Sequence, residues 1–158
     1  MKVRKPHLGP KEMRVAVGAL IGQAPQAISV HAVLVVTADG QPYMQATTSS
    51  PQELLSFLAG AQLSLMRRLW WPPAESDLRV GLSLQRQPLE GETAVTIGGI
   101  IQQPPAELAS YIALAVCENG LVVQTCASDE EMLTGIAGYQ HKLMVGMWFG
   151  DEEDGEDA

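Results

Sequence analysis

The chain has 158 residues, 46% of them hydrophobic and 18% charged, and a formal net charge of −8. This composition argues against general disorder, and two cysteines are too few for a disulfide framework. No apolar stretch reaches the roughly 18 residues of a membrane span, and no signal-peptide core follows the N-terminus, so we expect a soluble cytoplasmic protein without membrane contact.

The first half of the chain recurs in the second half. At an offset of 80, residues 15–40 match residues 95–120 at 8 of 26 positions. At an offset of 78, residues 46–71 match residues 124–149 at 10 of 26 positions. Self-similarity at a fixed period is the signature of a repeated structural unit. The sequence therefore predicts a tandem duplication.

The alignment also predicts the organisation of the chain. Repeat one occupies residues 1–73 and repeat two occupies residues 74–150, and the two are expected to pack as one globular domain. Residues 151–158 carry six acidic groups and predict a disordered tail.

The first part of each repeat is predicted to be β-structure. Residues 1–5 fit a short first strand, and the alternating apolar residues of 78–84 fit its equivalent in repeat two. Residues 13–21 taken alone also fit a helix. They align with the β-branched run at 93–101, which favours a strand in both repeats. Within that run, Gly98 is then expected to mark a bulge or bend.

A β-hairpin follows in each repeat. The Asn-Gly pair at 119–120 lies between apolar runs, which predicts a two-residue type I′ turn that pairs Leu114 with Thr125. The equivalent pairing in repeat one leaves residues 39–42 as a four-residue loop. Pro42, which cannot donate to a ladder, then falls inside that loop.

A long amphipathic helix ends each repeat. Residues 50–53 and 128–131 fit capping boxes, and each is followed by about five turns with an apolar stripe. A short helical turn is also expected at 104–109. Each repeat is thus β-β-β-β-α, and we predict an α+β fold: a pseudo-two-fold dimer of antiparallel sheets, each covered by one long helix.

Small and polar residues recur within these two helices. Gly60 and Gly138 would each cost about 1 kcal/mol relative to alanine, which suggests that another backbone approaches closely there. Gln62 and Gln140 occupy equivalent places in the apolar stripe. They predict a buried hydrogen bond, in one interpretation across the pseudo-two-fold axis.

Charge is distributed unequally along the chain. Residues 1–71 have a net charge of +4 and residues 72–150 a net charge of −6. The basic groups are either solvated surface or a candidate site for an anion or nucleic acid. This candidate patch consists of Lys2, Arg4, Lys5, Lys11, Arg14, Arg67 and Arg68. The acidic tail is either a solubilising end or a segment that recruits basic partners or competes for a basic groove.

Aromatic pairs end both long helices. Trp70 and Trp71 align with Trp148 and Phe149. We expect them to plug the ends of the core. In the alternative interpretation, one residue of each pair is exposed and anchors an interface.

The sequence contains no recognisable catalytic, metal or cofactor site. His7, His31 and His141 lack metal-ligand spacing, and we expect His31 to be structural or at the surface. Cys117 and Cys126 flank the second hairpin and are predicted to be separate, reduced thiols. We therefore predict no cofactor and no enzyme activity. An enzyme acting in a cleft between the repeats would need a buried pocket lined by His31 or Cys117.

The element order suggests two kinds of relative. Two β-β-β-β-α units resemble the Whirly and PUR-type folds, and this resemblance implies binding of single-stranded DNA or RNA across a sheet. The hairpin-then-helix portion is similar to Roadblock-type modules, which implies a dimeric adaptor platform. Our first hypothesis is a non-catalytic protein-interaction or assembly module with a protein partner or a second copy. The alternative is a single-stranded nucleic-acid binder that uses the basic first repeat.

Overall fold

The computed structural model describes residues 2–3, 8–48, 50–70 and 81–150, and of residues 2–3 only the backbone. The predicted acidic tail lies outside the described residues. So do Arg4, Lys5, His7 and Trp71.

The same order of elements occurs twice along the chain. The first half contains β1 (Lys2–Val3), α1 (Pro10–Ile21), the 3₁₀ turn η1 (Pro25–Ala27), β2 (Ile28–Thr37), β3 (Pro42–Ala46) and α2 (Pro51–Trp70). The second half contains β4 (Leu82–Arg86), α3 (Gly91–Ile101), the 3₁₀ turn η3 (Pro105–Glu107), β5 (Leu108–Cys117), β6 (Gly120–Thr125) and α4 (Asp129–Phe149). The short turn expected at 104–109 is confirmed.

All described strands form a single sheet. Its order is β1-β3-β2-β5-β6-β4, and only the edge strands β1 and β4 pair parallel to their neighbours. The fold is therefore α+β as predicted, but the prediction of separate antiparallel sheets is wrong. The two halves share one sheet because β2 pairs with β5. The helix after each edge strand leads into the first strand of the following hairpin, but the edge strand pairs in parallel with the second strand of that hairpin.

The segments that were predicted to be second strands are the helices α1 and α3. In α3, residues 94, 97, 98 and 101 are buried, which is the spacing of one face of a helix. Buried residues of α1 follow the equivalent pattern. The β-branched side chains of 93–101 favoured a strand, but burial along one helical face decides the structure. The β-β-β-β-α order, on which the resemblance to Whirly and PUR-type folds depended, is therefore replaced by β-α-β-β-α.

The central ladder relates the two halves to each other. β2 pairs antiparallel with β5, and Val33 lies directly opposite Ala113, its counterpart at the offset of 80. Pairs on either side are related in the same way: His31 faces Ala115, and Val35 faces Tyr111. The register is thus symmetric about the Val33–Ala113 pair.

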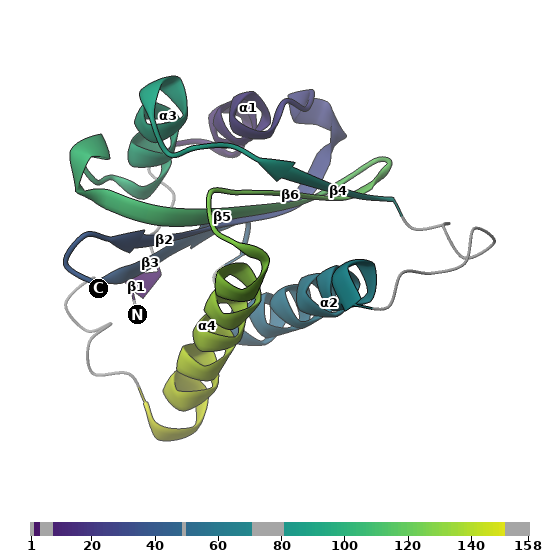
Figure 1. Cartoon of the computed structure of the whole chain (residues 1–158), viewed down its shortest axis with the longest axis vertical. Helices are drawn as coiled ribbons and strands as arrows, with labels where there is room; N and C mark the ends of the chain where they lie inside the picture. Colours follow the sequence, from purple (N-terminus) through teal and green to yellow (C-terminus); the bar gives the residue numbers. More distant parts are fainter. Residues whose placement is uncertain (1, 4–7, 49, 71–80, 151–158) are drawn as a thin grey trace.

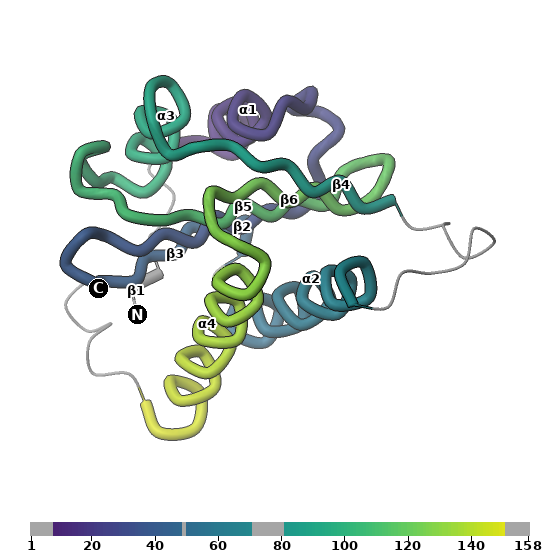
Figure 2. The backbone as a smooth tube through the Cα atoms, in the orientation of Figure 1, coloured from purple at the N-terminus to yellow at the C-terminus, as the bar shows by residue number. Residues whose placement is uncertain are grey.

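Helices cover both faces of the sheet, as Figures 1 and 2 show. α1 and α3 lie side by side on one face, and α2 and α4 cross on the other. The buried apolar residues accordingly form two clusters. One lies between the sheet and α2/α4 and includes Leu34, Leu58 and Ile136, and the other lies between the sheet and α1/α3 and includes Val33 and Ile97.

Both hairpins form, but their registers differ from the prediction. Leu114 pairs with Val123 rather than Thr125, because the turn consists of Glu118 and Asn119, and neither has the positive φ of a type I′ turn. Gly120 instead begins β6 with φ +125°. A Cβ there would lie 2.1 Å from the carbonyl oxygen of Gly81, so this glycine permits the close approach of the chain that leads into β4.

The first hairpin has a longer loop. Val36 pairs with Pro42, so Pro42 is the first residue of β3 and not part of the loop. A proline is tolerated at that position because a strand's first residue need not donate to the ladder.

The two long helices begin as the sequence predicts, and they contact each other. Ser128 Oγ accepts a hydrogen bond from the Glu131 amide at 3.2 Å, and Ser50 Oγ accepts one from the Glu53 amide at 3.5 Å. The amide of Gln62 donates to the carbonyl of Leu133 at 3.4 Å and so joins α2 to α4. The bond joins the two repeats, as one interpretation of Gln62 expected, but it is only partly buried.

Close approach of backbone occurs at different glycines from those predicted. A Cβ at Gly60 or Gly138 would meet no atom within 4 Å. A Cβ at Gly18 would lie 2.5 Å from the carbonyl oxygen of Gln23, and one at Gly98 would lie 2.8 Å from that of Gln103. At both places the chain leaves the helix through a left-handed residue and turns back over the glycine.

Candidate functional site

His31 is the centre of the most polar cluster in the first half of the sheet. It is only 4% exposed, and both of its ring nitrogens have partners. Nε2 lies 2.7 Å from Gln45 Oε1, and Nδ1 lies 3.0 Å from Thr47 Oγ1. A neutral ring with its proton on Nε2 satisfies both contacts, since Nε2 then donates to Gln45 and Nδ1 accepts from Thr47. The prediction that His31 is structural agrees with this geometry.

Burial lowers the pKa of His31 below its ordinary value, and its hydrogen bond to Gln45 only partly opposes that effect. The imidazole is therefore neutral at neutral pH. With both nitrogens bonded within the protein, it is not placed to act as a free base.

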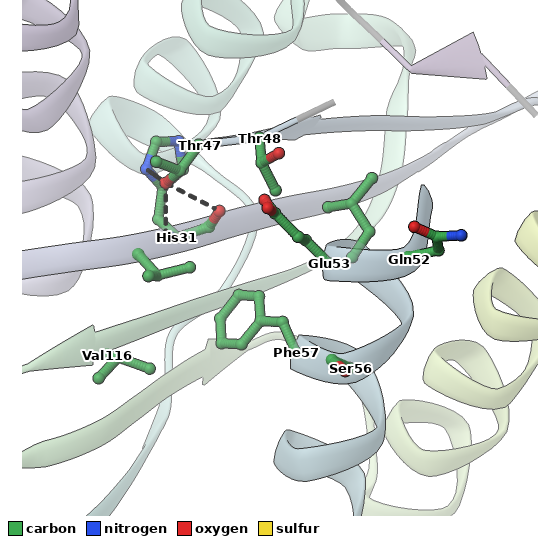
Figure 3. Close-up of a pocket in the computed structure, with 10 residues that line it drawn as sticks. His31, Thr47, Thr48, Gln52, Glu53, Ser56, Phe57 and Val116 are labelled. Carbon is green, nitrogen blue, oxygen red and sulfur yellow. Dashed lines mark hydrogen bonds between the residues drawn. The ribbon is translucent and has the colours of Figure 1, made fainter. Parts of the chain in front are cut away.

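A pocket of about 610 Å³ opens beside this cluster. We call it the α2 groove, because it lies between the first two turns of α2 and the strands β2 and β5 (Figure 3). Its lining consists of Val30, His31, Thr47, Thr48, Gln52, Glu53, Leu54, Ser56, Phe57 and Val116. This volume lies within the range of about 300–1,000 Å³ that is usual for ligand pockets.

The side chains of the α2 groove divide into a polar and an apolar wall. Figure 3 shows Thr47, Thr48 and the carboxylate of Glu53 on one side. The ring of Phe57 and the side chain of Val116 lie on the other, while Gln52 and Ser56 point away. Glu53 and Phe57 are four residues apart on α2, so they share one face of the helix.

A second cavity, of about 340 Å³, lies between α1 and the same end of the sheet. It shares His31 and Thr47 with the α2 groove, and its other lining residues include Met13, Arg14 and Gln45. Arg14 is the charged side chain of this lining.

The second half carries a different group at the equivalent of His31. Tyr111 receives a hydrogen bond from Gln124 Nε2 at 3.2 Å and donates to the carbonyl of Gln87 at 2.9 Å. Burial raises the pKa of Tyr111 to about 12. Nearby, the guanidinium of Arg86 bonds to the carbonyl of Ala127 and pairs with Asp129 at the start of α4.

The predicted basic patch is not brought together in the described part of the chain. Lys11 and Arg14 are exposed on α1, whereas Arg67 and Arg68 are exposed near the end of α2, on the opposite face of the sheet. Of Lys2 only the backbone is described, in β1.

The predicted aromatic core plugs are exposed instead. Trp148 is 73% exposed, Phe149 is 80% exposed and Trp70 is 54% exposed. They lie in the last turns of α4 and α2, and Figure 1 shows that the end of α4 points away from the sheet. The interface-anchor interpretation therefore remains for these three residues.

Both cysteines are free thiols, Cys117 buried and Cys126 exposed. Burial raises the pKa of the Cys117 thiol, which disfavours the reactive thiolate. Among the residues that the structure describes, no three His, Cys, Asp or Glu side chains are grouped as metal ligands would be.

Sequence reasoning did not find the α2 groove. Glu53 was interpreted only as a helix cap, and Phe57 and Gln45 were not singled out. The repeat alignment shows a difference at this place. Thr47 matches Thr125, whereas His31 aligns with Tyr111 and Phe57 aligns with Gly135. Positions that line the α2 groove therefore differ from their counterparts in the second half.

The helices in the described ranges are each too short or too polar to cross a bilayer. Comparison of the chain with known protein families, with curated proteins and with solved structures returned no match.

Proposed function

We propose that the protein is a non-catalytic interaction or assembly module, which binds a protein partner or a second copy of itself. The observation that carries this proposal is the exposure of Trp148 and Phe149, at 73% and 80%, at the end of α4. Trp70, at the equivalent place on α2, is 54% exposed.

Exposed aromatic side chains contribute favourable free energy when a binding partner covers them. Burying one removes about 150–250 Å² from water at about 25 cal/mol per Å². Aromatic residues are correspondingly enriched among the residues that dominate binding energy in interfaces. Two adjacent aromatic residues at a protruding helix end thus form a suitable anchor for a hydrophobic pocket on a partner.

The test compares the full chain with a Trp148→Ser/Phe149→Ser double variant. Leu63→Ser is the matched control, because Leu63 is 55% exposed but lies in the middle of α2. Sedimentation equilibrium measures self-association, and affinity capture measures binding to a protein partner. We expect the double variant to abolish the association and the control to keep it. A chain that stays monomeric and captures no protein in a Trp148-dependent way contradicts the proposal.

No observation on the described residues favours the single-stranded nucleic-acid alternative. Both faces of the sheet are covered by helices, and the exposed cations of α1 and α2 lie on opposite faces. A salt titration of oligonucleotide binding, with and without residues 151–158, separates the two hypotheses. Phosphate contacts are strongest at low salt, so the alternative requires binding there.

A further inference from the structure

We propose that the α2 groove binds an organic cation: an alkylammonium or alkylguanidinium group on a short apolar body. This site is separate from the helix ends that carry the proposed interaction function. Its ligand chemistry follows from the charge of the groove, from its aromatic wall and from what occupies the equivalent place in the second half.

One charged side chain lines the groove. Among its ten lining residues, Glu53 is the one carboxylate, and no lysine or arginine lines it. Glu53 is exposed, and Figure 3 shows its carboxylate on the polar side of the pocket, beside Thr48. The hydroxyl oxygens of Thr47 and Thr48 add acceptors next to it. An ammonium or guanidinium group has only donors and suits such a wall.

His31 does not oppose a bound cation. Its ring is held neutral by burial and by its contacts with Gln45 and Thr47. The formal charge among the lining side chains is therefore that of Glu53.

The apolar wall suits the rest of such a ligand. Phe57 is half-buried, and its ring lies on the same side of the pocket as Val116. The face of an aromatic ring attracts a cation held within about 6 Å of it. The aliphatic body of the ligand can lie against Val116 and Val30, which are also only partly buried.

The second half gives an internal precedent for this chemistry. At the start of α4 the chain itself supplies a guanidinium, that of Arg86, which lies against Asp129 and the carbonyl of Ala127. The counterpart of Phe57 there is Gly135, and the side chain of Ile112 lies 3.3 Å from where its Cβ would be. The counterpart of Glu53, Glu131, accepts a hydrogen bond from Ser128 at 3.0 Å. The second half thus holds a guanidinium near the start of its long helix, at Asp129, which aligns with Pro51 and not with Glu53.

The test is calorimetric titration of the full chain with n-hexylguanidinium, n-hexylammonium and the neutral 1-hexanol. We expect both cations to bind and 1-hexanol to bind at least about tenfold more weakly, the ratio expected for loss of one good charged contact. Glu53→Gln should reduce cation affinity by a similar factor. Glu131→Gln, the matched carboxylate of the second half, should leave it unchanged. Phe57→Leu should weaken both cations and reports on the aromatic wall.

One further ligand, compared with n-hexylguanidinium, distinguishes the source of the cation. A neutral-capped peptide with one arginine represents a side chain of a partner protein, and n-hexylguanidinium represents a free small molecule. Tighter binding of one assigns the source. Equal binding of 1-hexanol and the cations, equal effects of Glu53→Gln and Glu131→Gln, or no binding up to about 10 mM would overturn the proposal. Because none of these variants alters Trp148 or Phe149, failure here leaves the proposed interaction function untouched.

Discussion

His31 and Tyr111 occupy equivalent positions in the two halves of the sheet, and each is bonded to a glutamine on the adjacent strand of its own half. His31 contacts Gln45 at 2.7 Å, and Tyr111 contacts Gln124 at 3.2 Å. The polar framework is therefore shared, but the first half holds an imidazole at this position where the second half holds a phenol.

His31 makes the stability of the protein depend on pH. Its pKa is lowered by burial, so the unfolded chain binds a proton at a higher pH than the folded chain does. Above the ordinary value of 6.5 both states are neutral and His31 contributes nothing. As the pH falls below 6.5, the free energy of unfolding decreases. Denaturant titrations at a series of pH values measure this decrease.

In His31→Gln this part of the pH dependence should be absent, so the difference from wild type shrinks on acidification. His141→Gln, which removes an exposed histidine, is the control. Arg14 faces His31 from α1, and Glu53 faces it from α2. Both are retained in these variants. Parallel pH profiles for wild type and His31→Gln would contradict the prediction.

The glycines of the helices should separate into two classes. Gly18→Ala and Gly98→Ala place a Cβ within 3 Å of a backbone oxygen, and we expect each to lower the free energy of unfolding by about 1–3 kcal/mol. Gly60→Ala and Gly138→Ala meet open space and should raise it by about 0.5–1 kcal/mol. Urea unfolding of the four variants measures both effects. The same sign for all four would refute the distinction.

Tyr139 joins the second half of the chain to the first. Its hydroxyl donates to the carbonyl of Val35 at 2.6 Å, and burial raises its pKa. Tyr139→Phe keeps the ring and removes the bond, so the carbonyl loses a buried partner. We expect a loss of about 1–3 kcal/mol in the free energy of unfolding. A change within the error of a urea titration would show that the bond contributes nothing to stability.

Arg86 and Asp129 should be coupled only weakly. Their side chains are 43% and 47% exposed, so solvent screens the ion pair. A double-mutant cycle with Arg86→Ala and Asp129→Ala should give a coupling energy of about 0.2–1 kcal/mol that diminishes in high salt. Arg86→Ala alone should cost more than Asp129→Ala, because the guanidinium also bonds to the carbonyl of Ala127. A coupling energy that does not respond to salt would contradict this account.

Local signals predicted the long helices but not α1 and α3. The serine caps and apolar stripes of 50–70 and 128–149 specify helices by themselves. In 93–101 the β-branched side chains favoured a strand, whereas the spacing of the buried positions is that of a helix. Because the two segments align, the wrong prediction of a strand at 93–101 was applied to 13–21 as well. The spacing of Ala94, Ile97 and Ile101 was the better guide, because burial outweighs intrinsic propensity.

The candidate site was less predictable than the fold. The α2 groove depends on how far α2 stands from β2 and β5, which no local pattern in the sequence encodes. His31 was expected to be structural or at the surface, but its contact with Gln45 required the register of the first hairpin, and the predicted register there was displaced by three residues. The exposure of Trp148 likewise depends on the direction in which α4 runs away from the sheet.

The pairing of Val33 with Ala113 limits how the protein can be divided. β2 and β5 are interior strands only because each covers the other, and the ten residues of β2 are mostly apolar on both faces. In a first half produced alone, β2 would be an edge strand whose unpaired N–H and C=O groups can bond to a strand of another chain. Since the ladder is symmetric about Val33, two such halves could meet there in the native register. An isolated half would therefore either form a homodimer in the native register or aggregate.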